Sequence, residues 1–97
     1  LAILPISEKY HDYASALIKE LEQHEIRAIM DERDEKIGRK IRDAEVNKLP
    51  YMLIVGEKEA GSNTVSVRKH GEGDIGSFGL EQFITYFKKA IAASLEG

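Results

Sequence analysis

Apolar residues recur along the chain at two spacings, every second residue or every third and fourth, which distinguish strands from helices. Residues 2–6 form a short apolar run that predicts a strand, and the alternation in residues 26–31 predicts a second one. Between these strands, the apolar face of a predicted helix consists of Tyr10, Tyr13, Ala14, Leu17, Ile18 and Leu21. Ser7 suits the N-cap of this helix, and Glu25 follows its expected end in place of the usual Gly.

The middle of the chain repeats this helix-and-strand pattern. Residues 36–48 predict a second helix, and its buried stripe is expected to be Ile37, Ile41 and Ala44. Residues 51–55 are uniformly apolar, which is typical of a central strand covered on both faces. Residues 64–69 alternate between apolar and polar side chains, so they predict a half-exposed strand.

The end of the chain predicts a short edge strand and a long helix. The glycine-rich residues 70–79 have room for a very short strand around residues 75–78. The apolar face of the last helix consists of Leu80, Phe83, Ile84, Phe87, Ile91 and Leu95. The order of elements implies an α/β sandwich in which helical crossovers make the first three strands parallel. The short link after residues 51–55 predicts an antiparallel hairpin.

Composition narrows the classes of protein that the chain can belong to. Its 97 residues suit one small domain, and its hydrophobic and charged fractions of 42% and 32% are typical of a globular protein. It has no cysteine, which excludes disulfides and thiolate metal sites. No apolar run reaches the ~20 residues that span a bilayer. Because the chain begins at Leu1 without a Met, we expect it to be a piece of a longer protein.

Several motifs associated with catalysis or cofactors lack the context that they need. Residues 71–76 match G-x-G-x-x-G, but no strand–turn–helix unit surrounds them, so a glycine-rich turn is the preferred interpretation. Asp31 at a strand end lacks the acidic pair of a phosphoacceptor site. The three histidines lie in separate segments without metal-ligand spacing. We therefore expect no catalytic residue, metal site or cofactor in this domain.

A charged loop followed by a basic helix is the most informative stretch of the chain. The net charge of −3 disfavours a free-standing nucleic-acid binder, but residues 36–48 contain five Lys or Arg. A solvated helix face is the simplest interpretation of such a run. The alternative is readout of unpaired RNA bases, with Asp34 and Glu59 as hydrogen-bond acceptors and Arg42 and Arg68 as donors. Gly38, in the first turn, would let a partner approach the bare helix backbone.

Three segments together resemble a known family. They are residues 33–42 (RDEKIGxKIR), 50–59 (PYMLxVGxKE) and 65–68 (VSVR), and they resemble the C-terminal anticodon-binding domain of threonyl-tRNA synthetases. The resemblance covers essentially the whole chain, so residues 1–97 are expected to form one such domain. It implies a three-layer α/β/α sandwich with a mixed five-stranded sheet, mostly parallel with one antiparallel strand, as in class II synthetases.

The resemblance also implies a partner and a set of contacts. The domain would bind the anticodon loop of threonine tRNA and recognise the second and third bases of the anticodon. The implied anticodon-binding residues are Asp34, Lys36, Arg42, Glu59 and Arg68, and weaker phosphate-positioning residues would be Arg39 and Lys40. Position 34 is often Asn in the family, and the Asp present here accepts hydrogen bonds but donates none.

The remaining implications concern the parent enzyme. It would be a cytoplasmic, homodimeric threonine–tRNA ligase whose ATP, Mg and Zn belong to a separate catalytic domain of the same chain, and no membrane partner is implied. The alternative is an accessory or regulatory protein-interaction module that keeps the fold without RNA binding. The joint presence of Lys36, Arg42, Glu59 and Arg68 disfavours that alternative, because a protein-interaction role would not require this set.

Overall fold

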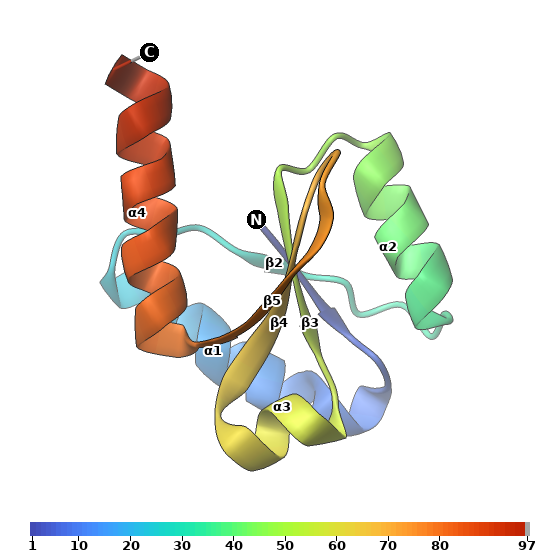
Figure 1. Cartoon of the computed structure of the whole chain (residues 1–97). Helices are drawn as coiled ribbons and strands as arrows, with labels where there is room; N and C mark the ends of the chain where they lie inside the picture. The colour runs from blue at the N-terminus through green and yellow to red at the C-terminus, as the bar shows by residue number, and fades with distance from the viewer. Residues whose placement is uncertain (97) are drawn as a thin grey trace.

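A five-stranded sheet forms the centre of the molecule (Figure 1). The computed structural model describes residues 1–96, and the side chains of residues 1–92. The strands, in the spatial order β2-β1-β3-β4-β5, are β1 (Ala2–Pro5), β2 (Ile29–Met30), β3 (Tyr51–Val55), β4 (Thr64–Lys69) and β5 (Gly73–Gly79). The helices are α1 (His11–Gln23), preceded by a single 3₁₀ turn (Glu8–Tyr10), then α2 (Ile37–Val46), α3 (Glu57–Ser62) and α4 (Leu80–Glu96).

The strand directions follow from the connections. β1 pairs in parallel with β2 and β3, while the pairs β3–β4 and β4–β5 are antiparallel. Only β4 therefore runs against the other four strands of the sheet, which confirms the mixed sheet with one reversed strand. Half of the four strand pairings are antiparallel, so the expectation of a mostly parallel sheet was slightly too strong.

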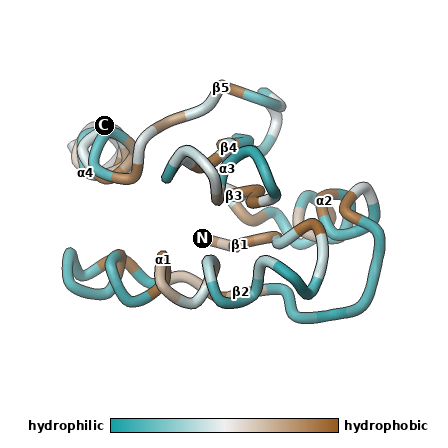
Figure 2. Tube along the Cα trace, turned by 90° about the horizontal axis from the view of Figure 1, so that it is seen from below, coloured by the Kyte–Doolittle hydropathy of each residue, from teal (hydrophilic) through white to brown (hydrophobic). Residues whose placement is uncertain are grey.

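Helices cover both faces of the sheet, so the expected three-layer arrangement is confirmed (Figures 1 and 2). α1 and α4 pack on one face, where the buried cluster includes Leu17, Leu21, Phe83 and Val65. α2 packs on the other face through a smaller cluster of Ala2, Leu4, Ala44 and Met52. β3 lies between the two clusters, and Leu53 and Val55 are fully buried, as the uniformly apolar run predicted.

Three local features differ from the sequence-based expectation. The link between β3 and β4 contains the short helix α3 in place of a plain hairpin turn. β5 spans seven residues and is longer than predicted. β2 has only two residues, and Ile26, which was expected to begin it, instead donates its amide to the carbonyl of Leu21 at the end of α1. Glu25 adopts a left-handed φ of 61° there, a conformation that Gly would adopt at less cost.

The C-terminal helix largely agrees with its predicted apolar face. Phe83 and Ile84 are buried in the core, and Leu80 and Phe87 pack against it. Ile91 is 42% exposed, so its predicted burial was wrong. Leu95 lies outside the residues whose side chains the structure describes.

Candidate nucleic-acid interface

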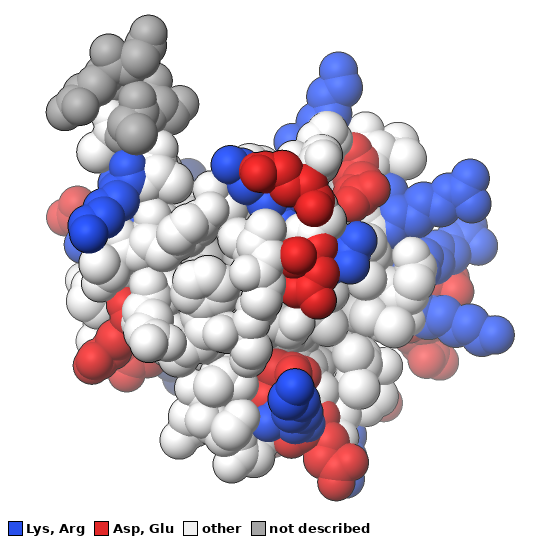
Figure 3. Space-filling model, in the orientation of Figure 1, with Lys and Arg blue, Asp and Glu red and all other residues white. Residues whose placement is uncertain are grey.

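The outer face of α2 forms a basic hollow. A concavity of about 480 Å³ is lined by Gly38, Arg39, Arg42 and Asp43. Arg39 and Arg42 are both exposed, and Lys and Arg side chains project from this side of the molecule over α2 (Figure 3). A Cβ added to Gly38 would meet no atom within 4 Å, so the surface beside it is open to a partner. The hollow therefore combines two cations, the Asp43 carboxylate that is paired with Arg33, and an accessible stretch of helix backbone.

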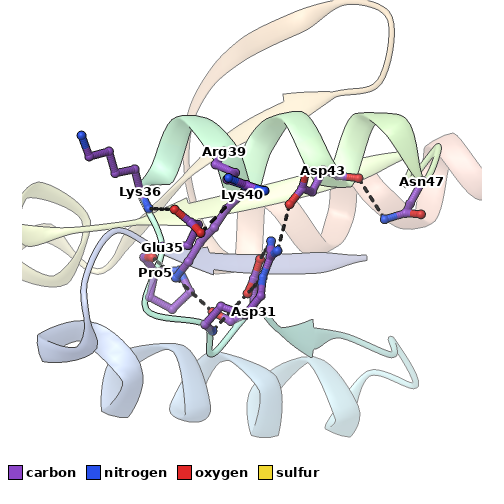
Figure 4. Close-up of polar contacts among 9 residues, drawn as sticks. Pro5, Asp31, Glu35, Lys36, Arg39, Lys40, Asp43 and Asn47 are labelled. Atoms are coloured by element: carbon purple, nitrogen blue, oxygen red, sulfur yellow. Dashed lines mark hydrogen bonds and ion pairs between the residues drawn. The ribbon is translucent and has the colours of Figure 1, made fainter.

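Lys40 does not belong to this exposed face. Its side chain is 1% exposed, and it points inward beneath α2 (Figure 4). Its Nζ donates to the carbonyl of Pro5 at 3.0 Å and to that of Asp31 at 3.2 Å. The expectation that Lys40 positions a phosphate is thus corrected, because a buried ammonium engaged by two carbonyls does not reach a ligand on the surface. Position 40 follows Ile37 by one helical turn, which places it on the side of α2 that faces the sheet.

The charged loop before α2 is held at its base and exposed at its tip. Arg33 donates two guanidinium hydrogen bonds to the Asp31 carboxylate and one, of 2.8 Å, to Asp43 of α2. Beyond this clamp, the side chains of Asp34 and Lys36 are exposed. The structure therefore places both of these predicted contact residues in solvent next to the start of α2.

The clamp has a consequence that can be tested by acid titration. Hydrogen bonds from the Arg33 side chain lower the pKa of Asp31 from its ordinary value of 3.8, and burial opposes them only in part. A carboxyl whose pKa is lower when folded stabilises the folded state above the unfolded pKa, and this stabilisation is lost as the pH falls through the folded value. We expect NMR titration to show the Asp31 carboxyl titrating below 3.8, and Arg33→Gln to move its pKa up toward 3.8. An Asp31 pKa that is the same in both proteins would contradict the clamp.

Arg68 lies on the sheet beside α2. In the β3–β4 register it is opposite Met52, whose side chain packs under α2 with Ala44. Arg68 is half-buried, and its Nε is a buried donor with no hydrogen-bond partner within the described residues. Buried donors are nearly always paired in folded proteins. The accessible part of this half-buried side chain, and not the buried Nε, is therefore what a bound ligand could contact.

Glu59 is placed differently from the other predicted residues. Its Oε1 accepts a 2.8 Å hydrogen bond from the amide of Gly56, which caps the start of α3. Burial raises the pKa of Tyr13 on α1, and the charge of Glu59 contributes to this shift as the smaller cause. The described contacts do not connect Glu59 with the hollow on α2, and one of its two oxygens already has a structural role.

The glycine-rich segment contributes to the β4–β5 hairpin. Gly71, Gly73 and Gly76 have positive φ values of 83°, 77° and 118°, which suit glycine. The register of β4 with β5 shifts between Val67 and Arg68, which marks a bulge next to this segment. Its glycines thus have a conformational role in the turn and the bulged strand, in agreement with the preferred interpretation of the motif.

The structure reveals two functional candidates that the sequence reasoning missed. The first is the buried Lys40, whose ammonium donates to the carbonyls of Pro5 and Asp31. The second is the clamp in which Arg33 binds Asp31 and Asp43. Asp31 and Arg33 lie two residues apart at a strand end, which was the available sequence signal. The partner of Arg33 on α2, Asp43, is ten residues further along the chain, so local spacing did not reveal it. Among residues 1–96, no helix has the length and apolarity to cross a membrane, and no cluster of three potential His, Asp or Glu metal ligands is found.

Comparison with known proteins agrees with this geometry. A family model described as "Anticodon binding domain" matches residues 1–90. The chain is 53% identical over 95 residues to the threonine–tRNA ligase of Cytophaga hutchinsonii, covering 98% of this chain and 15% of that protein. It is 61% identical over 83 residues to the threonine–tRNA ligase of Bacteroides thetaiotaomicron, covering 86% of this chain and 13% of that protein. The chain therefore spans only a small part of the length of these relatives.

A solved structure is also similar over most of the chain. It is the RNA binding domain of threonyl-tRNA synthetase from Cryptosporidium parvum, with a TM-score of 0.84 and 30% sequence identity. The match covers 91% of this chain and 22% of that one. Both the fold and the sequence thus agree with the resemblance inferred from residues 33–42, 50–59 and 65–68.

Proposed function

The chain belongs to the anticodon-binding domain family, and from this premise we propose that it reads the anticodon loop of a threonine tRNA. We propose further that it is a non-catalytic domain, comprising residues 1–97, of a threonine–tRNA ligase. The two relatives described above bear that enzyme name. The proposed parent enzyme is cytoplasmic and homodimeric. Its catalytic core, on the same chain, would use ATP, Mg and Zn.

The observation that supports this function best is the open basic hollow on α2. Arg39 and Arg42 both line it, together with the bare backbone of Gly38. A guanidinium can donate two parallel hydrogen bonds to a base edge, whereas an exposed cation that touches only phosphate carries no sequence information. We propose that Arg42 contacts a base and that Arg39 contacts a phosphate.

The surroundings of the hollow supply further contacts for an unpaired loop. Asp34 lies exposed in the preceding loop, Lys36 lies exposed at the N-cap of α2, and the half-buried Arg68 offers a guanidinium from the sheet beside α2. Unpaired bases present their edges to such groups, and duplex RNA does not. We assign Glu59 a contact through Oε2, since Oε1 is bonded to Gly56. The proposed bases are the second and third of the anticodon.

Binding to anticodon stem-loops tests this function directly. We expect the chain to bind a threonine anticodon stem-loop more tightly than stem-loops altered at the second or third anticodon base, by about 5- to 150-fold for each base. The dissociation constants are measured by fluorescence anisotropy at one fixed salt concentration, because phosphate contacts make affinity strongly salt-dependent.

Two outcomes would contradict the proposal. Equal affinity for all stem-loops would show that the domain does not read the anticodon. Recovery of protein partners without RNA from cells of the source would instead favour a protein-interaction module of the same fold. A stem-loop altered only in its stem is the control, and it is expected to bind as tightly as the threonine stem-loop.

A further inference from the structure

Lys40 is a charged side chain in a place where folded proteins usually put apolar ones. Among the described side chains, it is the only polar or charged one that is fully buried, with 1% exposure. It faces the backbone carbonyls of Pro5 and Asp31, at 3.0 and 3.2 Å, and the described ion pairs do not include it. Burial of an ammonium is costly unless its donors are satisfied, and a buried cation is weak evidence for stability by itself. Its placement therefore points to a role beyond packing.

The two carbonyls show what Lys40 connects. Pro5 ends β1, and Asp31 directly follows β2 and begins the charged loop. Lys40 lies within α2, so one side chain ties this helix to the ends of two parallel strands (Figure 4). The amide of Asp31 also donates to the carbonyl of Ile3 in β1. Both backbone polar groups of Asp31 are therefore bonded, its carbonyl to Lys40 and its amide to β1.

A second connection between α2 and the loop lies one turn further along the helix. Arg33 bridges the Asp31 carboxylate and the Asp43 carboxylate, with contacts of 2.8 Å to each. Inside the loop, the amide of Glu35 donates to the carbonyl of Arg33 at 3.0 Å. Positions 40 and 43 of α2 thus hold positions 31 and 33 of the loop, and the carbonyl of Lys36 at the N-cap accepts from the Arg39 and Lys40 amides of the helix.

We propose that Lys40 and Arg33 are positioning residues, which fix the loop of residues 31–36 against α2 before RNA binds. The proposal rests on the function proposed above and deepens it. A loop that is already ordered loses little conformational freedom on binding, so its contacts contribute more to affinity and discrimination. Lys40 itself touches no RNA in this arrangement, because its ammonium is buried under α2.

Hydrogen exchange of the free chain tests the positioning itself. Lys40→Met keeps the length of the side chain and removes its donors, and Lys19→Met makes the same change at an exposed position on α1. We expect the Glu35 and Arg33 amides of Lys40→Met to exchange about 10- to 100-fold faster, the range expected on loss of a hydrogen bond to a charged group. The amides of β3 should change much less, and Lys19→Met should behave like the unsubstituted chain.

Stem-loop binding distinguishes positioning from direct contact. We expect Lys40→Met to bind the threonine stem-loop less tightly and to discriminate less against altered second and third bases. The slope of log affinity against log salt should stay unchanged, because no phosphate contact is removed. Loss of a phosphate contact would instead reduce that slope by about 1.

The outcomes decide the proposal in either direction. Unchanged loop exchange in Lys40→Met would overturn it, and so would equal acceleration of loop and β3 amides, which indicates a purely structural role. If Lys40→Met does not fold, Arg33→Gln takes its place, with Arg27→Gln as the exposed control, and must show the same loop-specific acceleration. If the unsubstituted chain binds no stem-loop, the proposed function fails, and the exchange results still decide whether Lys40 and Arg33 hold the loop.

Discussion

Arg42→Ala is expected to reduce discrimination between the threonine anticodon stem-loop and its variants by about 1–3 kcal/mol, or about 5- to 150-fold. Arg42 lines the hollow on α2 and is exposed, so its removal disturbs no described contact within the fold. The free energy of unfolding should therefore stay within about 0.5 kcal/mol of that of the unsubstituted chain. The measurement is a set of stem-loop dissociation constants together with a urea unfolding curve for each protein.

Arg39→Ala provides the matched comparison on the same helix face. Arg39 lines the same hollow, and its only described ion pair is a long one of 3.9 Å to Glu35. As a phosphate contact, it should weaken binding of all stem-loops alike and lower the salt slope by about 1. If Arg42→Ala behaves in this way as well, base readout by Arg42 is wrong, and the hollow binds the RNA backbone alone.

Arg68→Met is expected to change stability and binding in opposite directions. The buried Nε of Arg68 has no partner within the described part of the chain, and such a donor costs about 1–3 kcal/mol. Met fills similar space without that donor, so the free energy of unfolding should rise by up to about that amount. Binding of the threonine stem-loop should weaken by about 5- to 150-fold, because the accessible part of the guanidinium, which is proposed to meet the RNA, is gone.

Arg68→Lys separates the charge of Arg68 from its geometry. Lys keeps the positive charge but lacks the planar fork that suits a base edge. We expect this variant to keep the salt dependence of binding and to lose base discrimination. Thermal unfolding and anisotropy titrations measure both properties. A less stable Arg68→Met protein that binds RNA normally would show that Arg68 serves the fold and does not contact the anticodon.

Local periodicity explains why most of the fold was predictable. The spacing of Leu17 and Leu21, and the uniformly apolar run of β3, depend on neighbours along the chain, and both were confirmed. The parallel arrangement of β1, β2 and β3 followed from their helical connections. The helix α3 was not predicted, because its six residues include a glycine and a serine, and these residue types favour turns.

The candidate site was predictable in part. A charged loop before a basic helix identified α2 and the exposed positions Asp34, Lys36, Arg39 and Arg42. The same pattern could not assign Lys40, because a lysine adjoining the apolar stripe of a helix can either extend into solvent or turn inward. Glu59 illustrates a similar limit, since its bond to the Gly56 amide depends on a helix start that the sequence did not reveal.

The sequence by itself thus determined the elements, their order and the stretch that we propose carries the function, because these depend on residues close together in the chain. Only the tertiary structure decided which cations remain free. Strand ends that meet under α2 supply the carbonyls that hold Lys40. The antiparallel register of β4 places Arg68 beside α2, with an Nε that has no partner among the described side chains. Both outcomes depend on partners far apart in sequence, which hydrophobic spacing does not specify.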